Sequence, residues 1–245
     1  MGSFFGTQSG VEFFNSLAWK YENQSRLYVL GKLQGEWDNV RRHCLVQAAA
    51  IGVLGDALGF PGNLVECMVK VAVLHDSRKR IDIMYDRRLR RGEEPLDFQE
   101  GEVKYFDEVF RSANPDPDLA NALNPWFLPK VLAGKASFPQ LVQFLADDMA
   151  KGEEIVPFDE RIDEVSARNP NPEPEVEKIL CRPYWEVERE VGHRVIAMVV
   201  AILKARYMPF DETNNPGQAL ADLINRGIQD RIDRLFNHIT AYELR

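Results

Sequence analysis

Hydrophobic residues recur along most of this chain at the spacing expected of α-helices. They return every three or four positions, and we find no sustained alternation between apolar and polar residues of the kind that marks a strand. The breaks between the periodic segments fall at glycine, proline and asparagine. The pattern predicts an all-α protein with helices over 11–34 (one or two helices), 38–58, 63–76, 77–91, 98–112, 138–150, 183–206 and 216–240.

Capping residues stand at the ends of several of these segments. Gly59 suits the left-handed conformation that closes many helices, and Asn63 can cap the helix that follows. Ser137 opens the helix at 138–150, and Asn215 offers an N-cap to the last helix. Local chemistry therefore supports the boundaries that the periodicity predicts.

One segment is rich in proline, with Pro170, Pro172 and Pro174 within five residues. Proline lacks a backbone N–H and clashes with the preceding turn, so this segment is expected to be a non-helical linker. We predict three parts: a helical bundle over 1–168, a proline-rich linker over 169–182 and a C-terminal extension over 183–245. The extension is expected to be a pair of long helices packed on the core.

Composition limits the class of protein. Of the 245 residues, 45% are hydrophobic, which is enough for a substantial core, and no apolar run approaches the roughly 18 residues that span a bilayer. The first residues lack the charged and apolar regions of a signal peptide. The three cysteines are widely spaced, as expected of reduced thiols. These features predict a cytoplasmic protein without a membrane partner.

Two of the four histidines lie on the apolar faces of successive predicted helices. His43 shares a face with hydrophobic residues of the 38–58 helix, and His75 does the same near the end of the 63–76 helix. The turn between these helices is short, which predicts an antiparallel hairpin. At 1.5 Å per residue, His43 lies about 22 Å before the turn and His75 about 18 Å after it. Both imidazoles are therefore expected at the same end of the hairpin.

The residue after the second histidine is an aspartate, Asp76. A single histidine on an apolar face is more often a hydrogen-bonded core residue than a metal ligand. Two histidines at one end of a hairpin, beside an aspartate that is costly to bury without a cation, shift the balance towards a metal site.

The residues around these positions resemble the HD-domain superfamily of metal-dependent phosphohydrolases, which is named for its His-Asp pair. The segments VRRHCLVQAAAIGVLGDALG (40–59) and VAVLHDSRK (71–79) are similar to the first two core helices of that family. VQFLADD (142–148) is similar to the helix that carries its last ligand, and IVPFDERIDEVSAR (155–168) follows the same pattern. The resemblance covers about residues 38–168 and implies an HD-like fold for the 1–168 core.

The resemblance implies a set of four metal ligands: His43, His75, Asp76 and Asp147. Two imidazoles and two carboxylates suit one divalent metal, manganese, iron, cobalt, nickel or magnesium, better than structural zinc. It also implies that Asp76 is catalytic, accepting the proton of the attacking water, and that Lys79 contacts the phosphate of the substrate.

The identity of the last ligand is open from the residues alone. The apolar face of the 138–150 helix is flanked by Asp148, whereas Asp147 lies opposite it, so periodicity favours Asp148 as the inward group. The resemblance favours Asp147, which we take as the ligand. Asp148 is the alternate ligand, or a residue that orients one.

A run of positively charged residues follows this motif. Residues 78–91 hold seven lysines and arginines against two aspartates, in a chain of formal net charge −8. Arginine binds phosphate bidentately, so we predict that Arg42, Arg78 and Lys79 bind an anionic substrate. A solvated helical face is the alternative reading of the later arginines.

We predict a metal-dependent phosphohydrolase that cleaves a phosphomonoester or nucleotide with an activated water. The net negative charge disfavours a nucleic-acid partner, although a nuclease remains an alternative. A second alternative is a catalytically inactive HD-fold protein with a regulatory or scaffolding role. The di-iron oxygenase branch of the superfamily ranks last, because residues 77–146 contain no further histidine. Homo-oligomerisation stays open.

Overall fold

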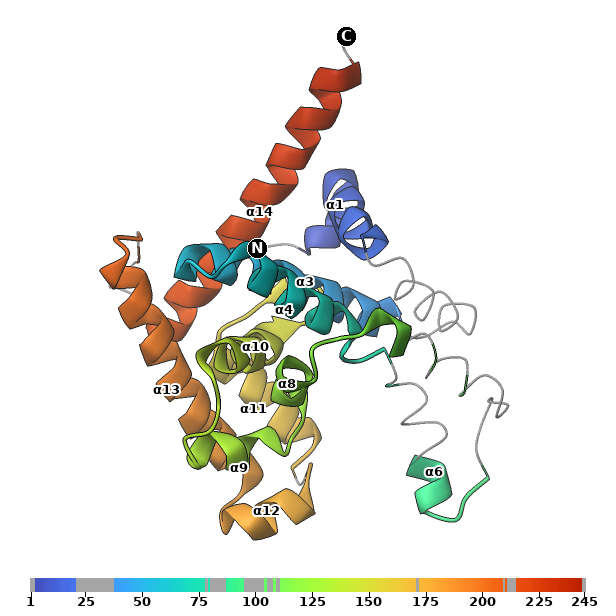
Figure 1. Ribbon diagram of the computed structural model, residues 1–245, viewed down its shortest axis with the longest axis vertical. Helices are drawn as coiled ribbons and strands as arrows, with labels where there is room; N and C mark the ends of the chain where they lie inside the picture. Colours follow the sequence, from blue (N-terminus) through green and yellow to red (C-terminus); the bar gives the residue numbers. More distant parts are fainter. Residues whose placement is uncertain are drawn as a thin grey trace.

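The computed structural model describes residues 3–20, 38–77, 79, 87–94, 104, 108, 111–170, 172–208, 210 and 215–243. These residues form helices and one antiparallel sheet of two short strands, which confirms the all-α prediction at the level of fold class (Figure 1). The short elements are η1 (Phe4–Gly6), α6 (Arg87–Arg90), α8 (Pro117–Ala120), η3 (Asn121–Leu123), α9 (Phe127–Leu132), α12 (Pro174–Leu180), β1 (Ala150–Lys151) and β2 (Glu154–Ile155). The longer helices are α1 (Gln8–Trp19), α3 (Asp38–Leu58), α4 (Gly62–Leu74), α10 (Phe138–Met149), α11 (Phe158–Arg168), α13 (Tyr184–Ala205) and α14 (Pro216–Glu243).

The hairpin of α3 and α4 lies at the centre of the molecule (Figure 1). Gly59 has a φ of +73°, so it closes α3 in the left-handed conformation as predicted. Asn63 is not the N-cap of α4, because Pro61 occupies that position and the helix begins at Gly62. The two helices approach closely at Gly55, where an added Cβ would lie 2.6 Å from a methyl group of Val65. Most of α3 from Cys44 onward is buried.

Helix α10 packs against both helices of the hairpin and against α13. Ser137 opens it, as predicted, and forms a reciprocal capping box with Gln140. The helix ends at Met149, and the chain turns at once into the β1–β2 hairpin, which the sequence analysis did not predict. Helix α14 holds this hairpin in place, since its Asn225 donates a buried hydrogen bond of 2.8 Å to the backbone oxygen of Ile155.

The C-terminal helices pack on the core rather than apart from it. α13 contacts α10, α11 and α14, and α14 contacts α3 and α1, as Figure 1 shows. The segment expected to be a linker contains α12, which begins at Pro174. A proline in the first turn is tolerated because the first N–H groups of a helix have no partner within it. Beyond the core, the C-terminal end of α14 projects past the other helices (Figure 1).

Several predictions fall partly on residues that the structure does not describe. These are the second half of the 11–34 segment, most of the basic 77–91 segment, and most of the 98–112 helix. Within the described part of the chain, no helix is both long enough and apolar enough to cross a membrane.

Candidate metal centre

His43 and His75 meet at the open end of the α3–α4 hairpin. His43 lies in the second turn of α3, and His75 follows the last residue of α4, so the antiparallel packing brings them together. Their ring centroids are 5.4 Å apart, with the ring planes at 66°. The side chain of His43 is 13% exposed and that of His75 is 7% exposed. The hairpin thus places two nearly buried imidazoles side by side.

Asp147 from α10 completes the group. Its Oδ1 lies 3.0 Å from Nε2 of His43 and 3.2 Å from Nε2 of His75. The potential ligand atoms of these three residues all lie within 4.8 Å of one another. Of the two aspartates at the end of α10, Asp147 is therefore the one that faces both histidines.

Backbone carbonyls fix the orientation of both rings. Nδ1–H of His43 donates to the backbone oxygen of Ala150 over 3.1 Å, and Nδ1–H of His75 donates to that of Ala72 over 2.8 Å. Each Nε2 is therefore directed at the carboxylate of Asp147. An unprotonated Nε2 and a carboxylate oxygen repel each other at 3 Å, so the arrangement requires a proton or a metal ion between them.

The donor set fits a divalent metal. Adjacent ligands of an ion that makes bonds of about 2.1 Å at right angles are about 3 Å apart. The two nitrogen–oxygen distances of 3.0 and 3.2 Å match this separation. Imidazole nitrogen and carboxylate oxygen are also the donors that manganese, iron, cobalt and nickel accept together.

Asp76 lies at the edge of this group. Its Oδ2 is 3.7 Å from Nε2 of His75 and is paired with Nζ of Lys79. Burial opposes its charge, but His75 and Lys79 outweigh burial and lower the pKa of Asp76. Asp76 is thus a carboxylate near the cluster, with Lys79, which is 43% exposed, bound to one of its oxygens.

Burial and nearby charge set the ionisation of the central residues. Burial disfavours a charged His75 ring, but Cys44, Asp76 and Asp147 outweigh it and raise the pKa of His75 well above its usual value. Burial also disfavours a charged Asp147, yet His75 and His43 hold the pKa of this carboxyl well below its usual range. Both shifts mark a site that attracts positive charge.

The cluster lines a cavity of about 290 Å³. Five carboxyl groups line it against two cationic side chains, Lys79 and Arg161. The 122–128 segment and the start of α13 contribute most of its apolar and aromatic lining: Leu123, Pro125, Phe127, Leu128, Tyr184 and Trp185.

Two of the lining carboxyl groups form a second buried pair, Asp148 on α10 and Glu188 on α13. Burial and the neighbouring Glu188 raise the pKa of Asp148 well above its usual value, and burial raises the pKa of Glu188 to about 7. Glu188 is only 5% exposed, and no described residue bonds Oδ2 of Asp148 or Oε2 of Glu188. The pair therefore retains a proton near neutral pH.

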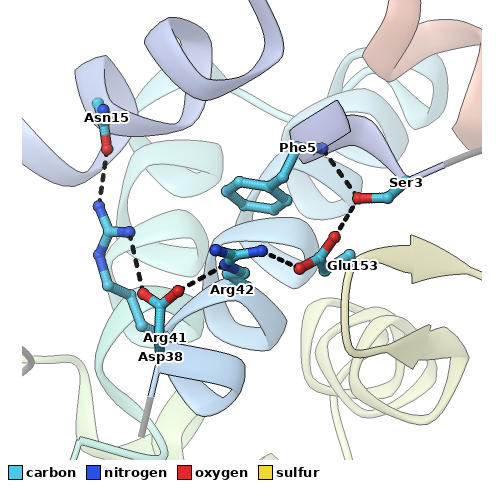
Figure 2. A network of polar contacts seen from close by, with 7 residues as sticks. All are labelled: Ser3, Phe5, Asn15, Asp38, Arg41, Arg42 and Glu153. Atoms are coloured by element: carbon cyan, nitrogen blue, oxygen red, sulfur yellow. Dashed lines mark hydrogen bonds and ion pairs between the residues drawn. The ribbon is translucent and has the colours of Figure 1, made fainter. Parts of the chain in front are cut away.

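The structure places Arg42 away from the cavity lining. Its guanidinium binds Asp38 over 2.7 Å, pairs with Glu153 and lies 5.0 Å from the ring centre of Phe5. Figure 2 shows Arg42 between these partners, with Ser3 binding the same Glu153. A substrate contact for Arg42 stays a prediction that this placement does not support.

Arg78 lies outside the described residues, as do residues 80–86 of the basic segment. Where that segment is described, Arg88 is engaged locally, with Glu93 at 3.2 Å and the backbone oxygen of Glu94 at 2.6 Å. The part of the basic segment that the structure describes therefore adds only Lys79 to the cavity.

Sequence reasoning missed Glu188 and Arg161. Glu188 follows Val187 and precedes Val191 on the buried face of α13, so a charged residue inside an apolar stripe was the available signal. Arg161 lies on α11, which is not among the predicted helices.

The chain matches no family model, no curated protein and no solved structure in our comparisons. The geometry of the site is therefore the basis for assigning a function.

Proposed function

We propose that this protein is a metal-dependent phosphohydrolase of the HD type that acts on a small phosphorylated substrate. The observation that carries the proposal is the convergence of His43, His75 and Asp147 in one cavity. Both imidazoles are aimed at the same carboxylate oxygen by main-chain hydrogen bonds. Such preparation of the ring nitrogens is typical of metal sites.

The charge of the residues that line the cavity indicates that a phosphate needs a cation to bind there. Asp76, Asp147, Asp148, Glu173 and Glu188 line it, and they outnumber Lys79 and Arg161 even though the Asp148–Glu188 pair retains one proton. A phosphate entering such a space meets repulsion unless a metal ion offsets the carboxylates. When bound, a divalent metal polarises a phosphoryl oxygen and lowers the pKa of water. Manganese, iron, cobalt, nickel and magnesium all suit the donor set.

The residues of the chain have distinct proposed roles. His43, His75 and Asp147 hold the metal, and Asp76 stands beside them as a further ligand. Asp76 also accepts a proton at the carboxylate oxygen that is not bound to Lys79. Lys79 is half-exposed at the cavity and can leave Asp76 to bind a phosphate oxygen.

The size of the cavity favours a small substrate. At about 290 Å³ it lies near the lower end of the range for small-molecule sites. The aromatic side chains of Phe127 and Trp185 offer an apolar wall for the body of a phosphomonoester or nucleotide. A nucleic-acid strand needs a longer cationic track than Lys79 and Arg161 provide.

The test is the metal content of purified variants. His75→Ala and Asp147→Ala are expected to lose at least about nine-tenths of the metal that the parent protein holds, since each removes one of three converging ligands. His193→Ala is the matched control, because His193 is an exposed histidine that binds Asp159 on α11. Asp148→Asn is expected to keep the metal, which separates it from its neighbour.

Activity is measured on the same proteins with a panel of phosphomonoesters, nucleotides and oligonucleotides. We expect hydrolysis of a small phosphoester by the parent and the His193→Ala control, and none by the His75→Ala variant. Full metal content in His75→Ala and Asp147→Ala would refute the coordination. A metal-loaded but inert parent would point to a regulatory role, and cleavage of oligonucleotides alone would point to a nuclease.

A further inference from the structure

A second cavity, of about 480 Å³, lies between α3, the end of α13 and α14. It is lined by four arginines and two aspartates, although the chain has a formal net charge of −8. The arginines are Arg206, Arg226, Arg231 and Arg234. Such a concentration of guanidinium groups in an acidic protein indicates a site for negative charge.

Only one of these arginines has an ion-pair partner among the described residues. Arg231 binds Oδ2 of Asp56 over 2.6 Å. Arg226 and Arg234 donate through Nε to backbone oxygens one turn earlier in α14, at 3.3 and 3.1 Å. Their terminal nitrogens, and the guanidinium of Arg206, have no carboxylate partner in the described part of the chain. Several fork-shaped donors are therefore available to one ligand.

The packing of α3 makes room for these guanidinium groups. A Cβ added at Gly59 would overlap the guanidinium of Arg206, and one added at Gly52 would overlap that of Arg231. The absence of a side chain at both positions lets the arginines lie against α3. Burial lowers the pKa of Arg231, and the nearby Arg234 acts in the same direction, whereas Asp56 opposes both.

The remaining lining is apolar and includes Val53, Ala57, Met208 and Leu223. A simple inorganic anion would contact the arginines and leave this apolar surface exposed. A ligand that joins phosphate to an apolar or aromatic body would use both, and the volume is sufficient for a molecule of that size. We propose that this groove binds a small phosphate-bearing anion with an apolar body, of the size of a nucleotide.

The site is separate from the candidate metal centre. Asp56 lies 13 residues after His43 on the same helix, which corresponds to about 20 Å along α3. No residue lines both cavities. The proposal therefore does not depend on the proposed catalytic function, and the two can be tested independently.

The test uses the whole protein carrying His75→Ala, treated with a chelator, so that binding at the metal centre does not contribute. Titration calorimetry with ADP and with pyrophosphate is expected to show binding that weakens as salt is added, and adenosine is expected to bind at least about tenfold more weakly than ADP. Arg206→Gln/Arg226→Gln is expected to weaken ADP binding at least about tenfold. Arg168→Gln, an exposed arginine outside the groove, is the matched control.

Circular dichroism and the unfolding midpoint establish that the double variant is folded. Arg206→Lys/Arg226→Lys serves as a second variant, since it keeps the charge but loses the fork, and is expected to retain part of the affinity. The proposal would be overturned if the Arg206→Gln/Arg226→Gln substitutions left ADP binding unchanged. It would also be overturned if the His75→Ala protein with all four arginines did not bind ADP. Tight, salt-sensitive binding of an oligonucleotide with no binding of ADP would also overturn it.

Discussion

Asp147 and Asp148 are adjacent in the chain, but their pKa values are shifted in opposite directions. Burial acts on both in the same sense, raising the pKa. Asp147 faces two imidazoles, which lower its pKa well below the usual value, whereas Asp148 faces the carboxyl group of Glu188, which raises it further. The partner, not the depth of burial, decides which carboxyl is charged at neutral pH.

The pH dependence of stability follows from Glu188. Its pKa is about 7 in the folded protein and close to 4.5 when unfolded, so the folded state holds a proton that the unfolded state has released between these values. The contribution of Glu188 to the free energy of unfolding therefore falls as pH rises from about 4.5 through 7. Relative to the parent protein, Glu188→Gln is expected to gain about 2–3 kcal/mol between pH 5 and pH 8.

Urea unfolding of the chelator-treated protein at several pH values measures this difference. Glu186→Gln is the control, because Glu186 is an exposed glutamate on the same helix. Its stability relative to the parent is expected to stay constant with pH. Parallel pH profiles for the parent and Glu188→Gln would show that the buried pair is not protonated.

The helices differ in how far the sequence determines them. The predicted bounds of α3 agree with the structure, and those of α4, α10, α13 and the start of α14 agree within two residues, because these segments have long apolar periodicity. Gly59, Ser137 and Asn215 also mark helix ends as predicted. The β1–β2 hairpin was missed because two-residue strands carry no readable alternation. The expectation that proline excludes a helix from this segment is wrong, because Pro174 sits in the first turn of α12, where proline is tolerated.

The faces of α10 show why periodicity could not choose its inward aspartate. The helix is covered on one side by α3 and α4 and on another by α11 and α13. Residues 140–146 are all buried, so this helix has no single apolar stripe. Both Asp147 and Asp148 then face the cavity, which a helical wheel cannot represent. The packing of α10 against helices distant in sequence decides which aspartate faces the histidines.

The contact between α11 and α13 allows a prediction at the level of the element. A Cβ at Gly192 would overlap the ring of Phe158, which is fully buried and has no room to move. Gly192→Ala is therefore expected to destabilise the protein by about 1–3 kcal/mol in urea unfolding. At Gly62, nothing lies within 4 Å of an added Cβ, so Gly62→Ala is expected to be neutral or slightly stabilising. Equal stability of the two variants would contradict this packing.

The candidate site is built from both the predicted core and the C-terminal region of the chain. The C-terminal region, expected to be an extension, supplies Tyr184, Trp185 and Glu188 to a cavity whose histidines come from α3 and α4. The N-terminal residues are tied to the same body through Arg42 and Glu153, as Figure 2 shows. Segments far apart in sequence, from α3 to α13, therefore line one cavity.

The placement of Arg42 predicts a structural role. Arg42→Ala removes its contacts with Asp38, Glu153 and Phe5, and is expected to lower the free energy of unfolding by about 0.5–1.5 kcal/mol. Metal content and the KM for a phosphoester are expected to stay unchanged. Arg168→Ala, at a more exposed ion pair, is expected to cost less than about 0.5 kcal/mol. A raised KM with unchanged stability would instead restore Arg42 as a substrate contact.

The acceptors that hold the two histidine rings belong to the main chain, at Ala72 and Ala150. No single amino-acid replacement deletes a peptide oxygen. The direction in which the ring nitrogens point is thus set by the path of the backbone. Side chains in the cavity wall can therefore change without turning the rings. Substitutions at wall positions such as Leu123 or Trp185 would therefore leave the proposed metal ligands in place.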